Sequence, residues 1–407
     1  MRRAGVAASL LLCALLAGAC SGLRPAPAGP HIDQSVQRLM SAAKVPGLAV
    51  ALVEHGQLAY LKTYGLRDVE SAAPLNPDTV MYGASLTKAT FAYLVMQLVD
   101  DGRIDLDQSI AAYLPKPLPE YEKYSDLAGD ERWRMITPRM LLSHTAGFPN
   151  FRFFTRDGVY RQDAKLSFWF EPGARFSYSG EGINLLQFVI EQGLGLDVGQ
   201  LMQQRVFDRF GMRRSSTTWR DDFAADNATG YDEAGKALGH KRRGSTRAAG
   251  SMDTTPADYA RFLAGLQRGE GISAASKKEM LRPQIEIDSV QQFPPQLTDS
   301  TTDNRGIALA YGLGWGLFRS SQGPAYFKEG HDDGTNNYVL CIENRQACLM
   351  LLSNSSNAEG IFKYLADDLL GPTCLPWFWQ NYIPYDHPEL REPSARDQHH
   401  LPCDEPG

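Results

Sequence analysis

The sequence predicts a mixed α/β (α+β) protein, in which one antiparallel sheet takes strands from both chain ends and a helical subdomain is inserted between them. Near the N-terminus, residues 48–54 and 57–63 are apolar runs joined by a His-Gly pair, which is typical of a tight strand pair. Near the C-terminus, residues 337–342 and 347–352 flank a four-residue turn in the same way. Of the 407 residues, 43% are hydrophobic, which is enough for a large core.

The segments between these strands carry helical signals. Residues 136–138 read Ile-Thr-Pro, a threonine cap followed by a proline in the first turn. Gly102 ends a segment whose apolar residues recur every three or four positions. The predicted helices cover residues 32–43, 89–101, 105–114, 185–192, 198–210, 255–266 and 357–370. Residues 284–305 are polar and have no period, so we expect a loop that borders a cleft.

Ser85 and Lys88 are the most informative pair in the chain. They lie three positions apart at the start of a helix, so their side chains share a face. That face continues through Ala92, Val95 and Val99, and an ammonium group without a partner is costly to bury on such an apolar stripe. We therefore expect the pKa of Lys88 to be lowered, so that its amine acts as a base on the Ser85 hydroxyl. The alternative is a serine that caps the helix beside a lysine that extends to water.

The surroundings of this pair resemble the serine β-lactamase and penicillin-binding-protein superfamily, which has Ser-x-x-Lys at this place. Residues 140–147, Met-Leu-Leu-Ser-His-Thr-Ala-Gly, and the segment around Trp315 are similar to further superfamily segments. The resemblance covers roughly residues 32–370 and points to the branch of class C β-lactamases and their esterase relatives. It implies a β-lactamase-like fold with a serine nucleophile. We interpret His144 as a structural residue, because Lys88 already holds the role of base.

The superfamily's second motif, Tyr-x-Asn, falls at residues 178–180, which read Tyr-Ser-Gly. The resemblance implies that Tyr178 takes part in acid/base chemistry, since a phenol near an ammonium group ionises or relays a proton. Glycine-rich turns on both sides favour a position in a cleft over that of a core tyrosine. Gly180 stands where the superfamily has the asparagine that helps hold the lysine and the substrate's acylamide. Glu181 is a candidate to replace part of that function.

The superfamily's third motif, Lys-Thr-Gly followed by a small residue, is assigned to residues 331–334, His-Asp-Asp-Gly. In this alignment the Gly334 N–H joins that of Ser85 in holding the oxyanion. His331 then positions a substrate carboxylate or takes part in the proton network. A register shift of one residue and a solvated acidic turn are the alternatives. Because His331 is mostly neutral at pH 7 and two aspartates follow it, we expect a weak dependence on a substrate carboxylate.

The N-terminal residues 1–19 have the pattern of a signal peptide, with two arginines, an apolar run and small residues before a cut. Cys20 follows as in a bacterial lipoprotein, although ordinary cleavage after Ala19 is the alternative. Residues 20–31, rich in Pro, Ala and Gly, are expected to form a flexible tether. The hydrolase-like domain follows, and residues 371–407 form a C-terminal extension. We expect an exported, periplasmic protein, anchored to the outer membrane if Cys20 carries a lipid.

Four cysteines remain after the signal segment and Cys20, and an exported protein allows three pairings of them. Cys341 and Cys348 lie symmetrically about the turn of the C-terminal hairpin, so we expect a disulfide between them. Cys374 and Cys403 then form the second bridge, and buried free thiols are the alternative. The tail also has a spacing that suits zinc, with the candidate ligands His399, His400 and Cys403. We favour the disulfide, so no cofactor is expected.

The sequence therefore favours an exported serine hydrolase that acts through an acyl-enzyme on Ser85. By resemblance, its substrates are β-lactams, D-amino-acid peptides or small carboxylic esters, and a carboxylesterase or D-amino-acid peptidase is the nearest alternative. A non-hydrolytic protein that binds β-lactams or cell-wall peptide is an alternative of another class. The net charge of -6 and the lack of a basic run argue against nucleic-acid binding. The expected partner is a small-molecule substrate, and the protein is expected to be a monomer.

Overall fold

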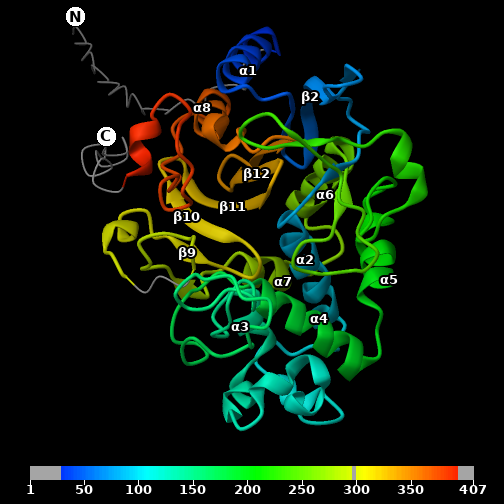
Figure 1. The fold of residues 1–407 in the computed structure, drawn as a ribbon, viewed down its shortest axis with the longest axis vertical. Helices are drawn as coiled ribbons and strands as arrows, with labels where there is room; N and C mark the ends of the chain where they lie inside the picture. Colours follow the sequence, from blue (N-terminus) through cyan, green and yellow to red (C-terminus); the bar gives the residue numbers. More distant parts are fainter. Residues whose placement is uncertain (1–28, 296–298, 393–407) are drawn as a thin grey trace, which may run out of the picture.

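The computed structural model describes residues 29–295 and 299–392. Its centre is a nine-stranded sheet with the order β3-β2-β1-β13-β12-β11-β10-β9-β8, antiparallel at every pairing (Figure 1). The strands of this sheet are β1 (Gly47–Glu54), β2 (Gln57–Asp68), β3 (Ala73–Pro74), β8 (Ile285–Glu286), β9 (Ala310–Tyr311), β10 (Gly316–Ser320), β11 (Gly323–Asp332), β12 (Thr335–Ile342) and β13 (Ala347–Ser353). Two short pairs lie outside it: β4 (Met81–Tyr82) with β7 (Asp253–Thr254), and β5 (Gly230–Tyr231) with β6 (Ala237–Gly239).

The α-helices are α1 (Gly29–Ala43), α2 (Leu86–Asp100), α3 (Pro138–Leu142), α4 (Gly180–Leu194), α5 (Val198–Met202), α6 (Pro256–Arg268), α7 (Ala274–Met280) and α8 (Glu359–Leu370). The N-terminal strand β1 pairs with the C-terminal strand β13, which confirms that both chain ends build the sheet. Helices α1 and α8 cover one face of the sheet, and α2 and α6 lie on the other (Figure 1). The predicted α+β architecture is thus confirmed.

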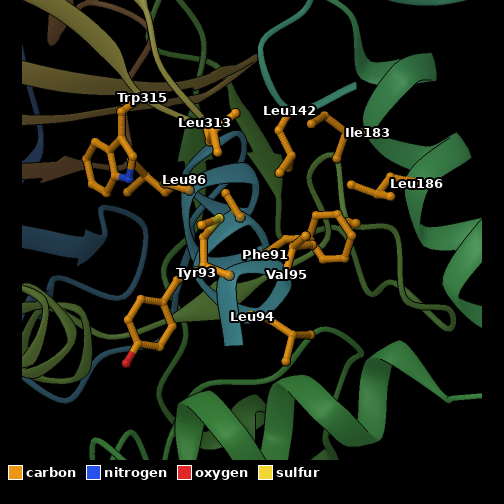
Figure 2. Close-up of a cluster of buried hydrophobic side chains, with 14 of the residues drawn as sticks. Leu86, Phe91, Tyr93, Leu94, Val95, Leu142, Ile183, Leu186, Leu313 and Trp315 are labelled. Atoms are coloured by element: carbon orange, nitrogen blue, oxygen red, sulfur yellow. The ribbon is translucent and has the colours of Figure 1, made fainter. Parts of the chain in front are cut away.

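Helix α2, which begins directly after Ser85, lies at the centre of the helices that cover one face of the sheet. Its apolar residues point in every direction, and each residue from Leu86 to Leu98 is buried. A helix that is apolar all round belongs inside a protein, so the single apolar stripe predicted from the sequence was too narrow. Figure 2 shows α2 side chains packed among residues of three other segments: Leu142, Ile183, Leu186, Leu313 and Trp315. This packing on all sides holds the start of α2 in a fixed position.

Two predicted helices are shorter or less regular than expected. The segment 198–210 forms α5 only to Met202 and continues as a π-helical turn, Gln203–Phe207. The segment 105–114 forms a single 3-10 turn, Ile110–Ala112. Boundaries of this kind depend on tertiary packing more than on local spacing.

Within residues 29–295 and 299–392, no helix has the length and the apolar character needed to cross a membrane.

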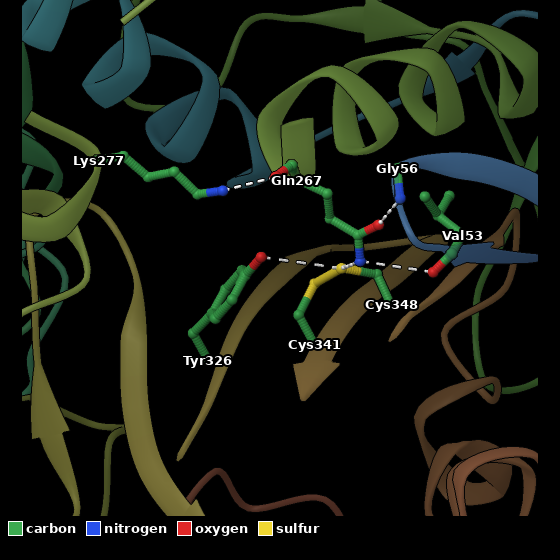
Figure 3. Close-up of a disulfide and its surroundings, with 7 residues drawn as sticks. All are labelled: Val53, Gly56, Gln267, Lys277, Tyr326, Cys341 and Cys348. Atoms are coloured by element: carbon green, nitrogen blue, oxygen red, sulfur yellow. Dashed lines mark hydrogen bonds between the residues drawn. A yellow bond between two sulfur atoms is a disulfide. The ribbon is translucent and has the colours of Figure 1, made fainter. Parts of the chain in front are cut away.

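A disulfide joins Cys341 of β12 to Cys348 of β13, as predicted from the hairpin. The two residues are direct partners in the strand register, and their Cα atoms are 4.0 Å apart. Figure 3 shows the bridge beside Gln267 of α6, whose amide contacts the Cys348 sulfur at 3.1 Å. The second predicted bridge, Cys374–Cys403, stays a prediction because Cys403 lies outside the described residues.

Replacing Cys341 and Cys348 together by alanine should lower the free energy of unfolding by about 2 kcal/mol, because the short loop is no longer closed in the unfolded chain. Denaturant unfolding of wild type and double variant measures this difference. The control is the same comparison after both proteins are reduced, where wild type and double variant should unfold with equal free energy. An equal unfolding free energy of the two unreduced proteins would contradict the stabilising role of this bridge.

Candidate active site

Ser85 occupies the position just before α2. Its side chain makes no capping hydrogen bond, so the interpretation of Ser85 as a simple helix cap is wrong. Instead, the Lys88 Nζ lies 2.9 Å from the Ser85 Oγ. The preceding residue, Ala84, has a φ of 46°, and this left-handed turn brings the chain sharply into the helix. Among the described residues, no hydrogen bond takes up the Ser85 backbone N–H, which is therefore available to an incoming oxygen.

Lys88 is buried, with 3% of its surface exposed, and does not extend to water. Besides Ser85, its Nζ contacts the Ala249 carbonyl oxygen at 2.6 Å. Burial lowers the pKa of Lys88 well below its usual range, the positive charge of Lys328 lowers it further, and the Glu329 carboxylate offsets part of that second effect. A neutral amine has a free electron pair, so Lys88 can accept the Ser85 proton across the short contact between them.

Tyr178 completes the first group of predicted residues. Its ring is close to two lysines, since the Nζ atoms of Lys88 and Lys328 are each 4.9 Å from the ring centroid. The Lys328 Nζ also donates to the Tyr178 hydroxyl at 2.9 Å. Burial, followed by the charge of Glu329, raises the pKa of Tyr178 well above its usual value, while a hydrogen bond with Ser85 acts in the opposite direction. Of the two roles predicted, the geometry favours a neutral phenol that relays a proton over an ionised one.

Three residues before the predicted third motif, the segment Lys328-Glu329-Gly330 approaches the site through the Tyr178 hydroxyl and the chain next to Ser85. At Gly330, an added Cβ atom would lie 2.7 Å from the Gly83 carbonyl oxygen and 3.2 Å from the Leu86 nitrogen. Only glycine lets β11 pass this close to the residues that flank the nucleophile. The Lys-x-Gly pattern at residues 328–330 is present in the sequence and could have been considered as a site segment.

In the structure, the Gly334 N–H is not free to hold an oxyanion, and the role predicted for His331 stays a prediction. Gly334 lies in the turn after β11, where its N–H already donates to the Ser356 hydroxyl at 2.8 Å. The His331 Nδ1 lies 3.4 Å from the Glu359 carboxylate. Burial lowers the pKa of His331, but Glu359 outweighs this and raises it to about 9. In the part of the chain that the structure describes, no hydrogen bond or ion pair joins either residue to Ser85.

Gly180 lies beside the site, but another asparagine occupies its neighbourhood. Its N–H donates to the Asn150 Oδ1 at 2.9 Å. A Cβ atom at position 180 would come within 2.9 Å of the Asn150 carbonyl oxygen, so the motif's asparagine does not fit this backbone without a shift. Glu181 does not replace the missing amide, because its carboxylate is paired with Arg152 at 2.7 Å. The contact with Asn150 was not predictable from either sequence segment alone.

His144 has the structural position that we predicted. Its Nδ1 accepts a hydrogen bond from the Ser179 N–H at 3.1 Å, and its ring centroid lies 4.4 Å from that of Tyr178. Burial, with the charges of Lys88 and Lys328, lowers the pKa of His144 well below its usual value. The imidazole is therefore neutral and supports the Tyr178 ring.

A pocket of about 540 Å³ lies next to the site. Two of its residues connect it to the groups described above, since Phe293 packs on the Tyr178 ring with centroids 5.1 Å apart and Asn150 binds Gly180. The pocket is lined without any charged side chain, by Asn150, Phe151, Phe154, Gly158, Trp169, Phe293, Pro294, Pro295 and Asn381. Such a lining favours an apolar group.

Across residues 29–295 and 299–392, no group of three or more His, Cys, Asp or Glu side chains is arranged to hold a metal ion. The zinc candidates of the tail lie outside the described residues: His399, His400 and Cys403.

Comparison with known proteins identifies a family whose sequence pattern matches this chain. A family model described as Beta-lactamase matches residues 32–370. Protein flp of Staphylococcus aureus (strain MW2) is 23% identical over 338 residues, a match that covers 80% of this chain but only 62% of that protein's length.

Two solved structures resemble the chain at a level that shows the fold alone. The octameric penicillin-binding protein homologue from Pyrococcus abyssi has a TM-score of 0.67 and 23% identity, covering 87% of this chain and 79% of that one. The D-alanine carboxypeptidase AmpC from Burkholderia cenocepacia has a TM-score of 0.64 and 20% identity, covering 84% and 98%. Because the family match runs over most of the sheet and its helices, the chain belongs to the Beta-lactamase family, within the serine β-lactamase and penicillin-binding-protein superfamily.

Proposed function

We propose that this protein is an acyl hydrolase that cleaves β-lactams or related amides and esters through a covalent acyl-enzyme on Ser85. The observation that carries the proposal is the 2.9 Å contact between the Ser85 Oγ and the buried amine of Lys88. A serine is a weak nucleophile by itself, and a base with a lowered pKa at hydrogen-bond distance is what activates it.

The reaction follows from the positions of these groups. The Ser85 Oγ attacks the carbonyl carbon of the substrate while Lys88 takes its proton. The negative charge on the carbonyl oxygen is held by the free Ser85 N–H at the start of α2, where the helix dipole also favours an anion. Tyr178, as a neutral phenol beside both lysines, passes the proton to the leaving group. Water then attacks the acyl group, with Lys88 again as the base.

Three other functions are compatible with the family and with the altered second motif: two related hydrolase activities and one non-hydrolytic binding function. A carboxylesterase and a D-amino-acid peptidase use the same chemistry on other substrates. A non-hydrolytic binder would be acylated but not deacylated, and Gly180 in place of asparagine is the feature that favours it. We further propose export through residues 1–19 and a lipid at Cys20, on the sequence pattern described above.

Turnover distinguishes a hydrolase from a binder. We expect p-nitrophenyl butyrate, an uncharged ester, to release many equivalents of nitrophenol per protein, and nitrocefin to be hydrolysed more slowly. The measurement is absorbance against time at known protein concentration, with heat-unfolded protein as the control. A burst of one equivalent that then stops would support the binder. No release above background from either compound would contradict the proposed function.

A further inference from the structure

Glu329 forms a buried ion pair with Lys328, and both side chains are almost entirely shielded from solvent, at 0% and 4% exposed. The Lys328 Nζ lies 2.6 Å from the Glu329 Oε1, and the Gln292 amide donates to the same oxygen at 3.1 Å. Glu329 is the middle residue of the Lys-x-Gly segment at positions 328–330. Its carboxylate is thus placed next to the lysine that contacts the Tyr178 hydroxyl.

The ammonium group of Lys328 has no hydrogen-bond donor left for a substrate. A lysine ammonium carries three N–H donors. In the structure, the Nζ donates to the Tyr178 hydroxyl at 2.9 Å, to the Glu329 carbonyl oxygen at 3.2 Å and to the Glu329 carboxylate. All three donors are therefore used by the protein itself.

The charge of Lys328 is cancelled as well. The ionisable groups that face the pair are all driven toward their neutral forms by burial: the pKa of Lys88 and that of His144 are lowered, and those of Tyr178, Tyr311, Tyr338 and Tyr382 are raised. Lys328 and Glu329 are then the charges that remain, and at this distance they sum to zero. A substrate carboxylate would lose its hydration here without gaining a cation.

We propose that Glu329 sets the specificity of the site by neutralising Lys328, which restricts efficient turnover to substrates without a carboxylate beside the scissile bond. This inference rests on the proposed function and narrows its substrate class to uncharged esters, thioesters and amides. The uncharged, aromatic lining of the pocket next to Tyr178 independently favours an apolar acyl group. Glu329 is a positioning residue in this account, because it acts through Lys328.

A matched pair of thioesters tests the proposal: S-phenylacetyl thioglycolic acid and its methyl ester. They share the acyl group and the bond that is cleaved, and differ only in the carboxylate of the leaving group. Each kcat/KM is divided by the rate constant of hydroxide hydrolysis of the same compound, because the methyl ester has the better leaving group. In wild type, this corrected value should be at least about tenfold higher for the methyl ester. At pH 6, Glu329→Gln should reduce this preference by about tenfold or more, since the protonated Lys328 is then no longer neutralised. Released thiol measures both rates.

Two further measurements distinguish a neutralising role of Glu329 from a merely structural one: the pH dependence of the preference in Glu329→Gln, and the preference of the conservative variant Glu329→Asp. Burial lowers the pKa of Lys328 and Glu329 raises it, so in Glu329→Gln the lysine is protonated only at lower pH. The preference for the methyl ester in that variant should therefore be smaller at pH 6 than at pH 8. Glu329→Asp keeps the negative charge and should keep the wild-type preference. Thermal unfolding of each variant shows whether the fold is intact.

Three outcomes would overturn the inference. They are a wild type that prefers the free acid, a Glu329→Gln variant with the wild-type preference from pH 5.5 to 8.5, and equal shifts in Glu329→Gln and Glu329→Asp. Each of these leaves the proposed function intact, provided that wild type hydrolyses one of the two thioesters. Neither turnover nor acylation of wild type by either thioester would contradict the proposed function, and this inference with it.

Discussion

Alanine in place of Ser85 is expected to lower kcat/KM by about four orders of magnitude or more on every substrate that the wild type hydrolyses, because the attacking atom is removed. Stability should hardly change. The Ser85 side chain makes no capping hydrogen bond, so its loss should cost less than the ~1 kcal/mol typical of a lost cap. Steady-state rates and denaturant unfolding on the same preparation measure both quantities.

A second serine at a helix start provides the matched control. Ser273 caps α7, where its side chain accepts a hydrogen bond from the Ser276 N–H. Its hydroxyl also donates to the Asp100 Oδ1 at 2.7 Å. Ser273→Ala should therefore show the reverse pattern, with activity unchanged and a loss of about 1–2 kcal/mol in unfolding free energy. A Ser85→Ala variant that retains half of its activity would show that another group is the nucleophile.

Alanine in place of Lys88 should have nearly as large an effect, with a loss of at least about 1,000-fold in kcat/KM, since serine and base act as a unit. Lys88→Arg should fail as well, because a guanidinium group keeps its proton and cannot serve as a base. The control is Lys277→Met, which removes another lysine whose pKa is lowered by burial but which donates to the Gln267 carbonyl oxygen. That variant should keep full activity. Appreciable activity in Lys88→Arg would contradict the role of Lys88 as base.

The pH profile tests the same role without a substitution. Lys88 accepts a proton only as the neutral amine, so kcat/KM should rise with pH as this group loses its proton. Burial lowers the pKa of Lys88 well below its usual range, and the rise should therefore be complete far below the pH at which an ordinary lysine titrates. A profile that still climbs at the ordinary lysine pKa would contradict the burial argument.

Local features of the site were predictable from the sequence. Ser85 and Lys88 lie one helical turn apart, so any helix at that place brings them together. The Cys341–Cys348 bridge follows from a hairpin whose turn lies midway between the two residues. In both cases a short spacing fixes the contact, and the structure confirms it.

Contacts between segments that are far apart in the sequence were harder to predict. Residues 328–334 contain two plausible glycines, and only the course of β11 past Gly83 decides that Gly330 and not Gly334 approaches the nucleophile. The prediction for residues 331–334 did not consider Lys328, which lies three residues earlier. Asn150 and Gly180 come from separate loops, so no spacing links them. Buried polar contacts of this kind depend on tertiary packing.

The most direct test of the account is the mass of the protein during turnover. Wild type is mixed with p-nitrophenyl butyrate, quenched in acid within the first turnovers, digested and analysed by tandem mass spectrometry. The account predicts a butyryl group on Ser85, absent from Ser85→Ala and enriched when deacylation is slowed. Turnover with no adduct at any time point, or an adduct on another residue that persists in Ser85→Ala, would contradict the acyl-enzyme mechanism.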